Sequence, residues 1–158
     1  MSDMNLSCDI LEMNESDRFQ IFFDKKNVFD SEIIVCMLVY NTGPEIKDAI
    51  NSIRSQETSR SISILIIDGG ISDDWKKYID TFEDIVIVKV NEYTVSQSRN
   101  LSHQISNKVF PVAKWICRLD SDDVLHSTSS IEEISQRLDM EASEKNWAIA
   151  GNSLSENG

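Results

Sequence analysis

Two runs of apolar, mostly β-branched residues, the second interrupted only by Ser63, constrain the fold of this chain more than any other feature. They cover residues 33–39 and 62–67, and a run of this kind is typical of a central strand buried on both faces of a sheet. Shorter runs at residues 85–90 and 114–119 predict two more strands. Segments with helical spacing of apolar residues lie between the runs. Strands that alternate with helices predict a parallel, three-layer α/β sheet with helices on both faces.

Turn and cap residues predict where the helices between these strands begin. Pro44 suits the first position of a helix that continues to about residue 56. Further helices are predicted near Trp75, from about residue 95 and from about residue 129, and a strand fragment is predicted at residues 147–150. The candidate caps are Ser72 or Asp73, Thr94 or Ser96, and Ser129 or Ser130.

The length of 158 residues is that of one domain. Residues 1–31 are polar and acidic apart from an apolar patch at residues 19–23. We interpret them as an N-terminal extension that forms either a short helix or a strand on the edge of the domain. Residues 32–158 carry the alternating pattern and are interpreted as the domain itself.

The net charge of −12 limits the partners of the chain. An acidic surface repels a phosphate backbone, so nucleic acid is a poor candidate, and an anionic membrane surface is disfavoured for the same reason. A nucleotide diphosphate is anionic as well. A ligand of that kind therefore requires a local cation, supplied by a metal ion, an arginine or a helix N-terminus.

Cysteine usage and the first residues of the chain bear on its location. The three cysteines, Cys8, Cys36 and Cys117, have no paired spacing, so we expect free thiols in a reducing compartment rather than disulfides or a zinc site. The start of the sequence has no basic and apolar pattern of a signal peptide. No apolar run approaches the ~18 residues of a membrane span. We expect a cytoplasmic protein without a transmembrane segment, either free or peripheral to the membrane.

Polar side chains follow each predicted strand of the sheet. Tyr40 and Asn41 follow the first apolar run, Asp68 the second, Asn91 the third, and residues 120–123 the fourth. Ligands of parallel α/β sheets bind at the carboxyl ends of the strands. The sequence therefore predicts that one edge of one sheet collects these polar residues into a binding site.

The acidic segment Asp120-Ser121-Asp122-Asp123 is the sharpest candidate for chemistry. Positions two apart in extended backbone point the same way, so Asp120 and Asp122 can face one ion. Mg²⁺ and Mn²⁺ bind oxygen ligands and typically pair one or two carboxylates with diphosphate oxygens. The alternative is an acidic turn that caps the next helix.

Two further residues have a functional and a plain structural interpretation. Asp68, before Gly69 and Gly70, can accept hydrogen bonds from a base or a ribose, or it can bond to its own turn. Arg99 lies in the first turns of a predicted helix, which is an unfavourable position for a cation unless it meets an anion; the alternative is a solvated surface arginine. No Ser/His/Asp arrangement, P-loop or Gly-rich dinucleotide motif is present.

Taken together, five segments resemble the family-2 glycosyltransferases in order and spacing, over about residues 33–151. No single segment is decisive. They are the opening strand and its Tyr-Asn turn at residues 35–41, the Ser-x-x-x-Gln helix end at residues 52–56, the strand and Asp-Gly-Gly turn at residues 64–70, the Asn…Ser-Arg-Asn stretch at residues 91–100, and the Leu-Asp-x-Asp-Asp form of the DxD motif at residues 119–123.

The resemblance implies a three-layer, Rossmann-like GT-A fold with a mostly parallel sheet, in which residues 32–158 form the nucleotide-sugar-binding domain. It implies an enzyme that transfers a sugar from a nucleotide-diphosphate sugar, a UDP-sugar first among them, to a glycan or lipid-linked acceptor, as in polysaccharide biosynthesis. The implied cofactor is Mn²⁺ or Mg²⁺. The implied nucleotide-binding residues are Tyr40, Asn41, Asp68, Arg99 and Asp120, and the implied metal ligands are Asp120, Asp122 and Asp123.

The sequence departs from the family pattern in two places. Gly69 and Ile71 replace the second Asp and the Ser of the usual turn. The sequence given also continues for only 35 residues after Asp123, where the family has its acceptor half and general base. We expect no general base among them, because most of their carboxylates lie on a predicted helix surface: Glu132, Glu133, Asp139, Glu141, Glu144 and Glu156.

Two alternatives follow from these departures. Either the chain is a truncated glycosyltransferase, or it is a degenerate, non-catalytic nucleotide-binding or interaction module of the same fold. In its form as an interaction module, the second alternative predicts indifference to nucleotide and metal, and an oligomer formed through the apolar sheet edge where the missing half would pack.

Overall fold

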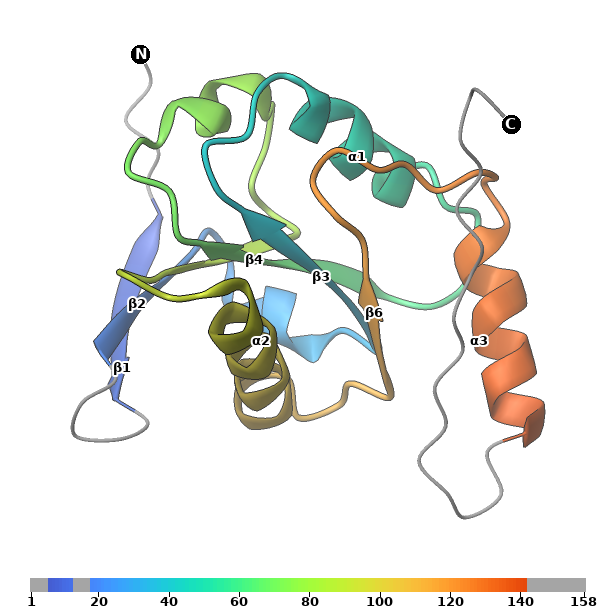
Figure 1. Ribbon diagram of the computed structural model, residues 1–158. Helices are drawn as coiled ribbons and strands as arrows, with labels where there is room; N and C mark the ends of the chain where they lie inside the picture. The colour runs from blue at the N-terminus through green and yellow to red at the C-terminus, as the bar shows by residue number, and fades with distance from the viewer. Residues whose placement is uncertain (1–5, 13–17, 142–158) are drawn as a thin grey trace.

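The computed structural model describes residues 6–12 and 18–141, and within them six strands form one sheet between two layers of helices (Figure 1). The structure confirms the predicted α/β class. The elements in chain order are β1 (Ser7–Glu12), β2 (Arg18–Phe23), η1 (Lys26–Asp30), β3 (Ile33–Val39), α1 (Glu45–Arg54), β4 (Ile62–Asp68), η2 (Asp74–Tyr78), β5 (Ile85–Lys89), α2 (Val95–Val109), β6 (Trp115–Arg118) and α3 (Ser130–Glu141).

The strand order is β1-β2-β5-β4-β3-β6. Strands β5, β4, β3 and β6 are parallel neighbours, whereas β2 pairs antiparallel with β5 and β1 antiparallel with β2. The two apolar runs at residues 33–39 and 62–67 occupy the centre, as a strand buried on both faces should. The four parallel strands therefore end at one common edge of the sheet.

The N-terminal segment is part of this sheet. Of the two alternatives for residues 1–31, the described part adopts the strand: β2 places Phe19, Ile21 and Phe23 in the core at alternating positions. The fifth strand predicted at residues 147–150 lies outside the described residues.

The two faces of the sheet bury separate apolar clusters. Helix α1, η2 and the start of α3 cover one face, and α2 with η1 covers the other (Figure 1). The two faces alternate along each strand, because successive side chains of a strand point to opposite sides. The first face presents Val35, Met37, Ile64, Ile66 and Ile87, and the second presents Ile34, Cys36, Leu65, Val86 and Val88.

Local signals fix the ends of the two covering helices. Helix α1 starts one residue after Pro44 and buries Ile46, Ala49, Ile50 and Ile53 at helical spacing; each fully buried Ile contributes about 2 kcal/mol. Helix α2 starts after Thr94, whose Oγ1 accepts a hydrogen bond from the Gln97 amide at 3.2 Å while Gln97 Oε1 accepts one from the Thr94 amide at 2.8 Å. Of the two candidate caps, Thr94 is the one used.

Across residues 6–12 and 18–141, none of the helices has the length and the apolar character needed to span a membrane.

Candidate functional site

The candidate site is the edge of the sheet where the parallel strands end. The Tyr40–Gly43 turn follows β3, Asp68 ends β4, and the acidic turn, residues 120–123, follows β6. Thr42 Oγ1 and Ser121 Oγ lie 3.0 Å apart in a hydrogen bond that joins the first and third of these segments. Strands β4 and β6 both flank β3, so Asp68 and the acidic turn lie two strand spacings apart, roughly 10 Å.

The acidic turn presents its carboxylates to solvent. Asp120, Asp122 and Asp123 are all exposed, and the Asp123 amide donates to the Asp120 carbonyl at 3.1 Å to close the turn. Within the described part of the chain, no ion pair or side-chain hydrogen bond reaches any of the three carboxylates. No group of three or more His, Cys, Asp or Glu side chains in that part is arranged to hold a metal ion. One or two carboxylates with free oxygens are nevertheless the donor set that Mg²⁺ takes when diphosphate oxygens complete its shell.

Asp68 lies inside the protein. Its carboxylate is fully buried and accepts three hydrogen bonds, from the Gly70 amide at 2.9 Å, from Trp75 Nε1 at 3.1 Å and from Lys89 Nζ at 3.0 Å. A buried carboxylate requires such partners because its charge has lost its hydration. Both oxygens are thus engaged within the protein, and the predicted role of Asp68 in binding a base stays a prediction.

Lys89 is the cation that compensates the buried charge. Its Nζ also lies 2.9 Å from Asp73 Oδ1, and Asp73 Oδ2 lies 2.8 Å from Lys76 Nζ. Burial on its own lowers the pKa of Lys89, but the hydrogen bonds with Asp73 and Asp68 outweigh it and the pKa is raised. Burial likewise raises the pKa of Asp73, but the hydrogen bonds from Lys76 and Lys89 prevail and lower it. The network holds the loop between β4 and η2 onto the end of β5.

The two glycines after Asp68 differ in the room around them. A Cβ on Gly70 would lie 3.2 Å from the Asn41 backbone nitrogen and 3.2 Å from Asp68 Oδ1, whereas a Cβ on Gly69 would meet nothing closer than 3.7 Å. Gly70 therefore lets the turn after β4 approach the turn after β3. Asn41, at that contact, has a positive φ of 52°. Residues held in this sparse backbone region gather at functional sites, and within the described residues the other non-glycine example, Glu92, lies in the loop after β5.

Large apolar side chains are exposed at the same edge. Tyr40 is 68% exposed and Ile71 90% exposed, and Val95 and Val124 are exposed as well. They belong to the loops or helix start that follow β3, β4, β5 and β6. An exposed aromatic ring beside a polar turn offers a surface on which a planar ligand can stack.

Arg99 lies in the second turn of α2, and its side chain is exposed. Because α2 follows β5, its N-terminal turns are at the edge of the sheet that carries the site. Within the described residues, the guanidinium has no ion pair with a carboxylate. The structure thus brings Tyr40, Asn41 and the acidic turn to one edge and places Arg99 at the helix start beside it.

Lys89 and Trp75 were not among the predicted site residues. A single lysine at the end of the apolar run Ile85–Lys89 was the available signal, since a charge there must find a partner at the edge of the sheet. Nothing in the sequence indicated that the indole of Trp75, seven residues after Asp68, donates to its carboxylate.

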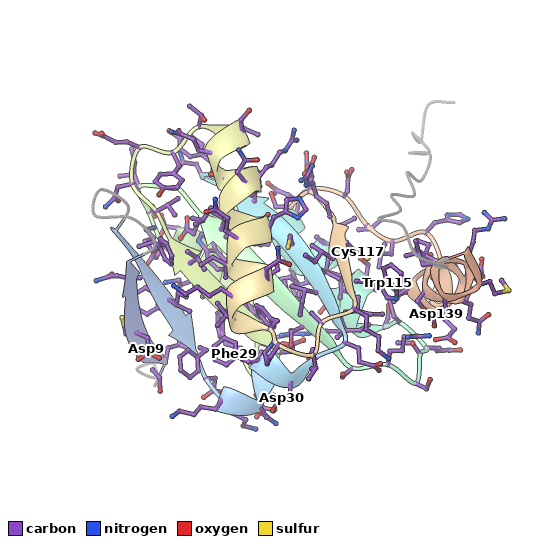
Figure 2. All side chains as sticks on the ribbon, turned by 90° about the horizontal axis from the view of Figure 1, so that it is seen from below. Asp9, Phe29, Asp30, Trp115, Cys117 and Asp139 are labelled. Atoms are coloured by element: carbon purple, nitrogen blue, oxygen red, sulfur yellow. The ribbon has the colours of Figure 1, made fainter. Side chains whose placement is uncertain are left out.

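The carboxylates of α3, none of which was predicted to be the general base, have partners within the protein. Glu132 accepts from Thr58 and Gln136, Glu133 from Ser129, and Asp139 pairs with Arg60. Figure 2 shows Asp139 of α3 beside Trp115 of β6, whose indole donates to it at 3.3 Å. The side chain of Glu141 lies outside the described residues, as do Glu144 and Glu156.

A shallow cavity of about 210 Å³ lies at the opposite edge of the sheet. Its lining includes Arg54 and Asp84, which are paired with each other at 2.6 Å, and Arg60, which is paired with Asp139 on α3. Its arginines are therefore neutralised within the protein, and the cavity is separate from the candidate site.

Solved structures share this fold. Residues 1–349 of S. aureus TarS match with a TM-score of 0.59 at 14% identity, over 79% of this chain and 38% of that one. A second structure of S. aureus TarS matches with a TM-score of 0.51 at 14% identity, over 79% of this chain and 23% of that one. The fold is that of the GT-A glycosyltransferases.

Sequence comparison then gives the family. The model of glycosyl transferase family 2 matches residues 34–143, and the chain belongs to that family. An uncharacterized glycosyltransferase of Mycoplasma genitalium is 29% identical over 97 residues, which are 59% of this chain and 33% of the relative. The chain thus matches about a third of the length of that relative.

Proposed function

We propose that this chain binds the nucleotide-diphosphate sugar donor, together with Mn²⁺ or Mg²⁺, of a glycosyl transfer reaction. A UDP-sugar is the first candidate donor, and a glycan or a lipid-linked sugar the candidate acceptor. The observation that carries the proposal is the hydrogen bond between Thr42 and Ser121. This bond joins the turn that carries the exposed ring of Tyr40 to the acidic turn, at one edge of a GT-A sheet. The three carboxylates of the acidic turn have no partners in the described part of the chain.

The proposed roles follow from exposure and charge. Tyr40 stacks on the base, and Asn41, at the tight contact with Gly70, presents its polar groups beside it. Asp122 and Asp120 bind the cation, and Asp123 supports the turn that carries them. The cation, when bound, neutralises the diphosphate as it leaves the sugar. Arg99, near the start of α2, adds a positive charge to that of the cation. Positive charge at the site is needed because the protein, with a net charge of −12, otherwise repels an anionic ligand.

Asp68 has a structural role in this proposal. Both oxygens of its carboxylate accept hydrogen bonds within the protein, so it fixes the turn of Gly69 and Gly70 against Asn41 and shapes the surface on which the base lies. The replacement of the usual Asp-Asp-Gly-Ser turn by Asp-Gly-Gly-Ile leaves the exposed Ile71 at that position, which favours apolar contact with a ligand over a hydrogen bond.

Calorimetric titration of UDP, UDP-sugars and other nucleotide-diphosphate sugars, with and without Mn²⁺, tests this function. We expect binding that depends on the cation and that Asp122→Asn weakens at least about tenfold, since the loss of partners one shell further out already lowers metal affinity by about 10–100-fold. Asp30→Asn is the matched control, because Asp30 is an exposed carboxylate at the opposite edge (Figure 2). No heat with any donor, in the presence of Mn²⁺, would contradict the proposal.

The second candidate function is a nucleotide-binding or interaction module without transfer. The observation that favours it is the engagement of Glu132, Glu133 and Asp139 on α3, which leaves no free carboxylate to serve as a base among the described residues after the acidic turn. Donor hydrolysis and transfer assays separate the two: cation-dependent binding without turnover by this chain supports the module.

A further inference from the structure

Two side chains at the end of α1 hold the segment that follows the acidic turn. Ser52 Oγ accepts a hydrogen bond from the Leu125 amide at 3.0 Å. Gln56 Nε2 donates to the Ser127 carbonyl at 2.7 Å, and Gln56 Oε1 accepts from the Ile131 amide at 2.8 Å. The segment from Leu125 to Ile131 is therefore held by these two side chains, which lie four positions apart in the sequence, and by the Glu57 amide, which donates to the Thr128 carbonyl at 2.7 Å.

The hydrogen-bonding groups of these two side chains are fully committed. The second donor of the Gln56 amide goes to the Ser52 carbonyl at 3.0 Å, so both hydrogens and the oxygen have partners. The Ser52 hydroxyl donates to the Ala49 carbonyl at 2.7 Å. That donation fixes the direction of its hydroxyl hydrogen and leaves a lone pair for the Leu125 amide. Neither group can turn away without losing a bond.

The acidic turn is consequently held at both of its ends. On the strand side, the Leu119 amide donates to the Cys36 carbonyl of β3 at 3.1 Å. On the helix side, the first fixed point is the Leu125 amide on Ser52. Between them the chain makes the Thr42–Ser121 bond and closes its own turn, while its carboxylates stay exposed. The distance between the two fixed points sets the shape of the turn.

The body of α3 is fastened by different groups. Thr58 donates to Glu132 at 2.5 Å, and Arg60 pairs with Asp139. These contacts hold the helix to the start of β4 and do not touch residues 119–127. They provide a means to loosen α3 without releasing the segment that follows the acidic turn.

We infer that Ser52 and Gln56 are positioning residues for the cation-binding turn. They lie outside the proposed site and act through residues 125–131, by holding the helix-side end of the acidic turn in place. The Ser-x-x-x-Gln spacing at the end of α1 places both side chains where they can bind the segment from Leu125 to Ile131. The positioning of the turn stands without the proposed function, and only the identification of the turn as a cation site rests on that function.

Amide hydrogen exchange, resolved by residue in NMR spectra, tests the positioning. The reporters are the amides of Asp123 and Leu119, because their hydrogen bonds do not involve the replaced side chains. We expect Ser52→Ala and Gln56→Ala to raise the exchange rate of the Asp123 amide about tenfold or more. Ser52→Thr keeps the hydroxyl, and Thr58→Val removes the bonds to Glu132 and to the Arg60 amide but leaves those of Ser52 and Gln56 intact, so both should stay within about twofold of the unaltered protein. Unchanged Asp123 exchange in the two alanine variants, or an equal rise in Thr58→Val, would overturn the inference.

Titration of the same variants with Mn²⁺ and UDP tests the link to the cation. We expect affinity to fall in Ser52→Ala and Gln56→Ala and to be retained in Ser52→Thr and Thr58→Val. If the unaltered protein binds neither probe, the proposed function fails, while the exchange rates still decide the positioning. If the alanine variants loosen the turn yet bind both probes with unaltered affinity, the assignment of a positioning role toward the cation is wrong.

Discussion

The ion pair between Lys89 and the buried Asp68 gives a quantitative test of the site's framework. Lys89→Met removes one partner and leaves a carboxylate inside the protein with only the Gly70 amide and the Trp75 indole. Breaking a buried pair in this way costs about 3–5 kcal/mol. The Lys89 side chain is 24% exposed, so water can replace part of the lost bond, and we expect a loss of about 2–3 kcal/mol.

Urea unfolding, followed by tryptophan fluorescence, measures this loss against a total stability of about 5–15 kcal/mol. Lys114→Met is the matched control, because Lys114 pairs with Glu32 at the surface, where the lysine side chain is 57% exposed. An exposed pair of this kind contributes about 0–1 kcal/mol.

A double-mutant cycle separates the pair from its surroundings. Asp68→Asn alone replaces one acceptor oxygen by an NH2 group that faces a protein donor. It should lower the free energy of unfolding by about 1–3 kcal/mol. In the double variant with Lys89→Met, both charges are absent, so the total loss should be smaller than the sum of the single losses by about 1–2 kcal/mol. Strict additivity, or a Lys89→Met loss no larger than that of Lys114→Met, would refute the role assigned to this ion pair.

Three further outcomes are expected. Gly70→Ala should lose about 1–3 kcal/mol in urea unfolding, because its Cβ would press on backbone at 3.2 Å, while Gly69→Ala should change stability by less than about 1 kcal/mol; equal effects would contradict the tight contact. Burial raises the pKa of Asp73, but its two lysine partners outweigh burial and lower it from 3.8. The stability that the Asp73 carboxylate contributes is therefore present above pH 3.8 and lost as the pH falls through the lowered pKa. The difference in melting temperature between the unaltered protein and Asp73→Asn should accordingly shrink between about pH 5 and pH 2. Burial raises the pKa of Cys117 to about 11, so iodoacetamide at about pH 8 should modify the exposed Cys8 first and Cys117 only on unfolding, as read by peptide mass spectrometry.

The sequence was sufficient for the central fold because its signals are local. The apolar runs at residues 33–39 and 62–67 predict buried strands, and the Thr94 cap and Pro44 mark helix starts within a residue. The N-terminal hairpin was undecided between helix and strand, because β2 joins the rest of the sheet only by pairing with β5, more than sixty residues further along the chain, while its other partner is β1. A pairing at that separation leaves no mark within the segment itself.

The candidate site was predictable as a place rather than as a set of contacts. Parallel strands bring their ends to one edge, so Tyr40, Asp68 and the acidic turn could be expected together. The burial of Asp68 was not visible, because it depends on Trp75 and on a lysine 21 positions away, and both are fixed by how the strands pack. The roles of the individual carboxylates stay predictions.

The order of the strands gives the two ends of the site unequal mechanical support. Asp68 ends a strand with neighbours on both sides, whereas the acidic turn leaves β6, which within the described sheet pairs with β3 alone over Ile33 to Cys36. Strands with fewer hydrogen bonds open at a lower free energy. Backbone opening should therefore cost less free energy at the acidic turn than at the end of β4, and the bonds of Leu119 to β3 and of Leu125 to Ser52 are what limit it.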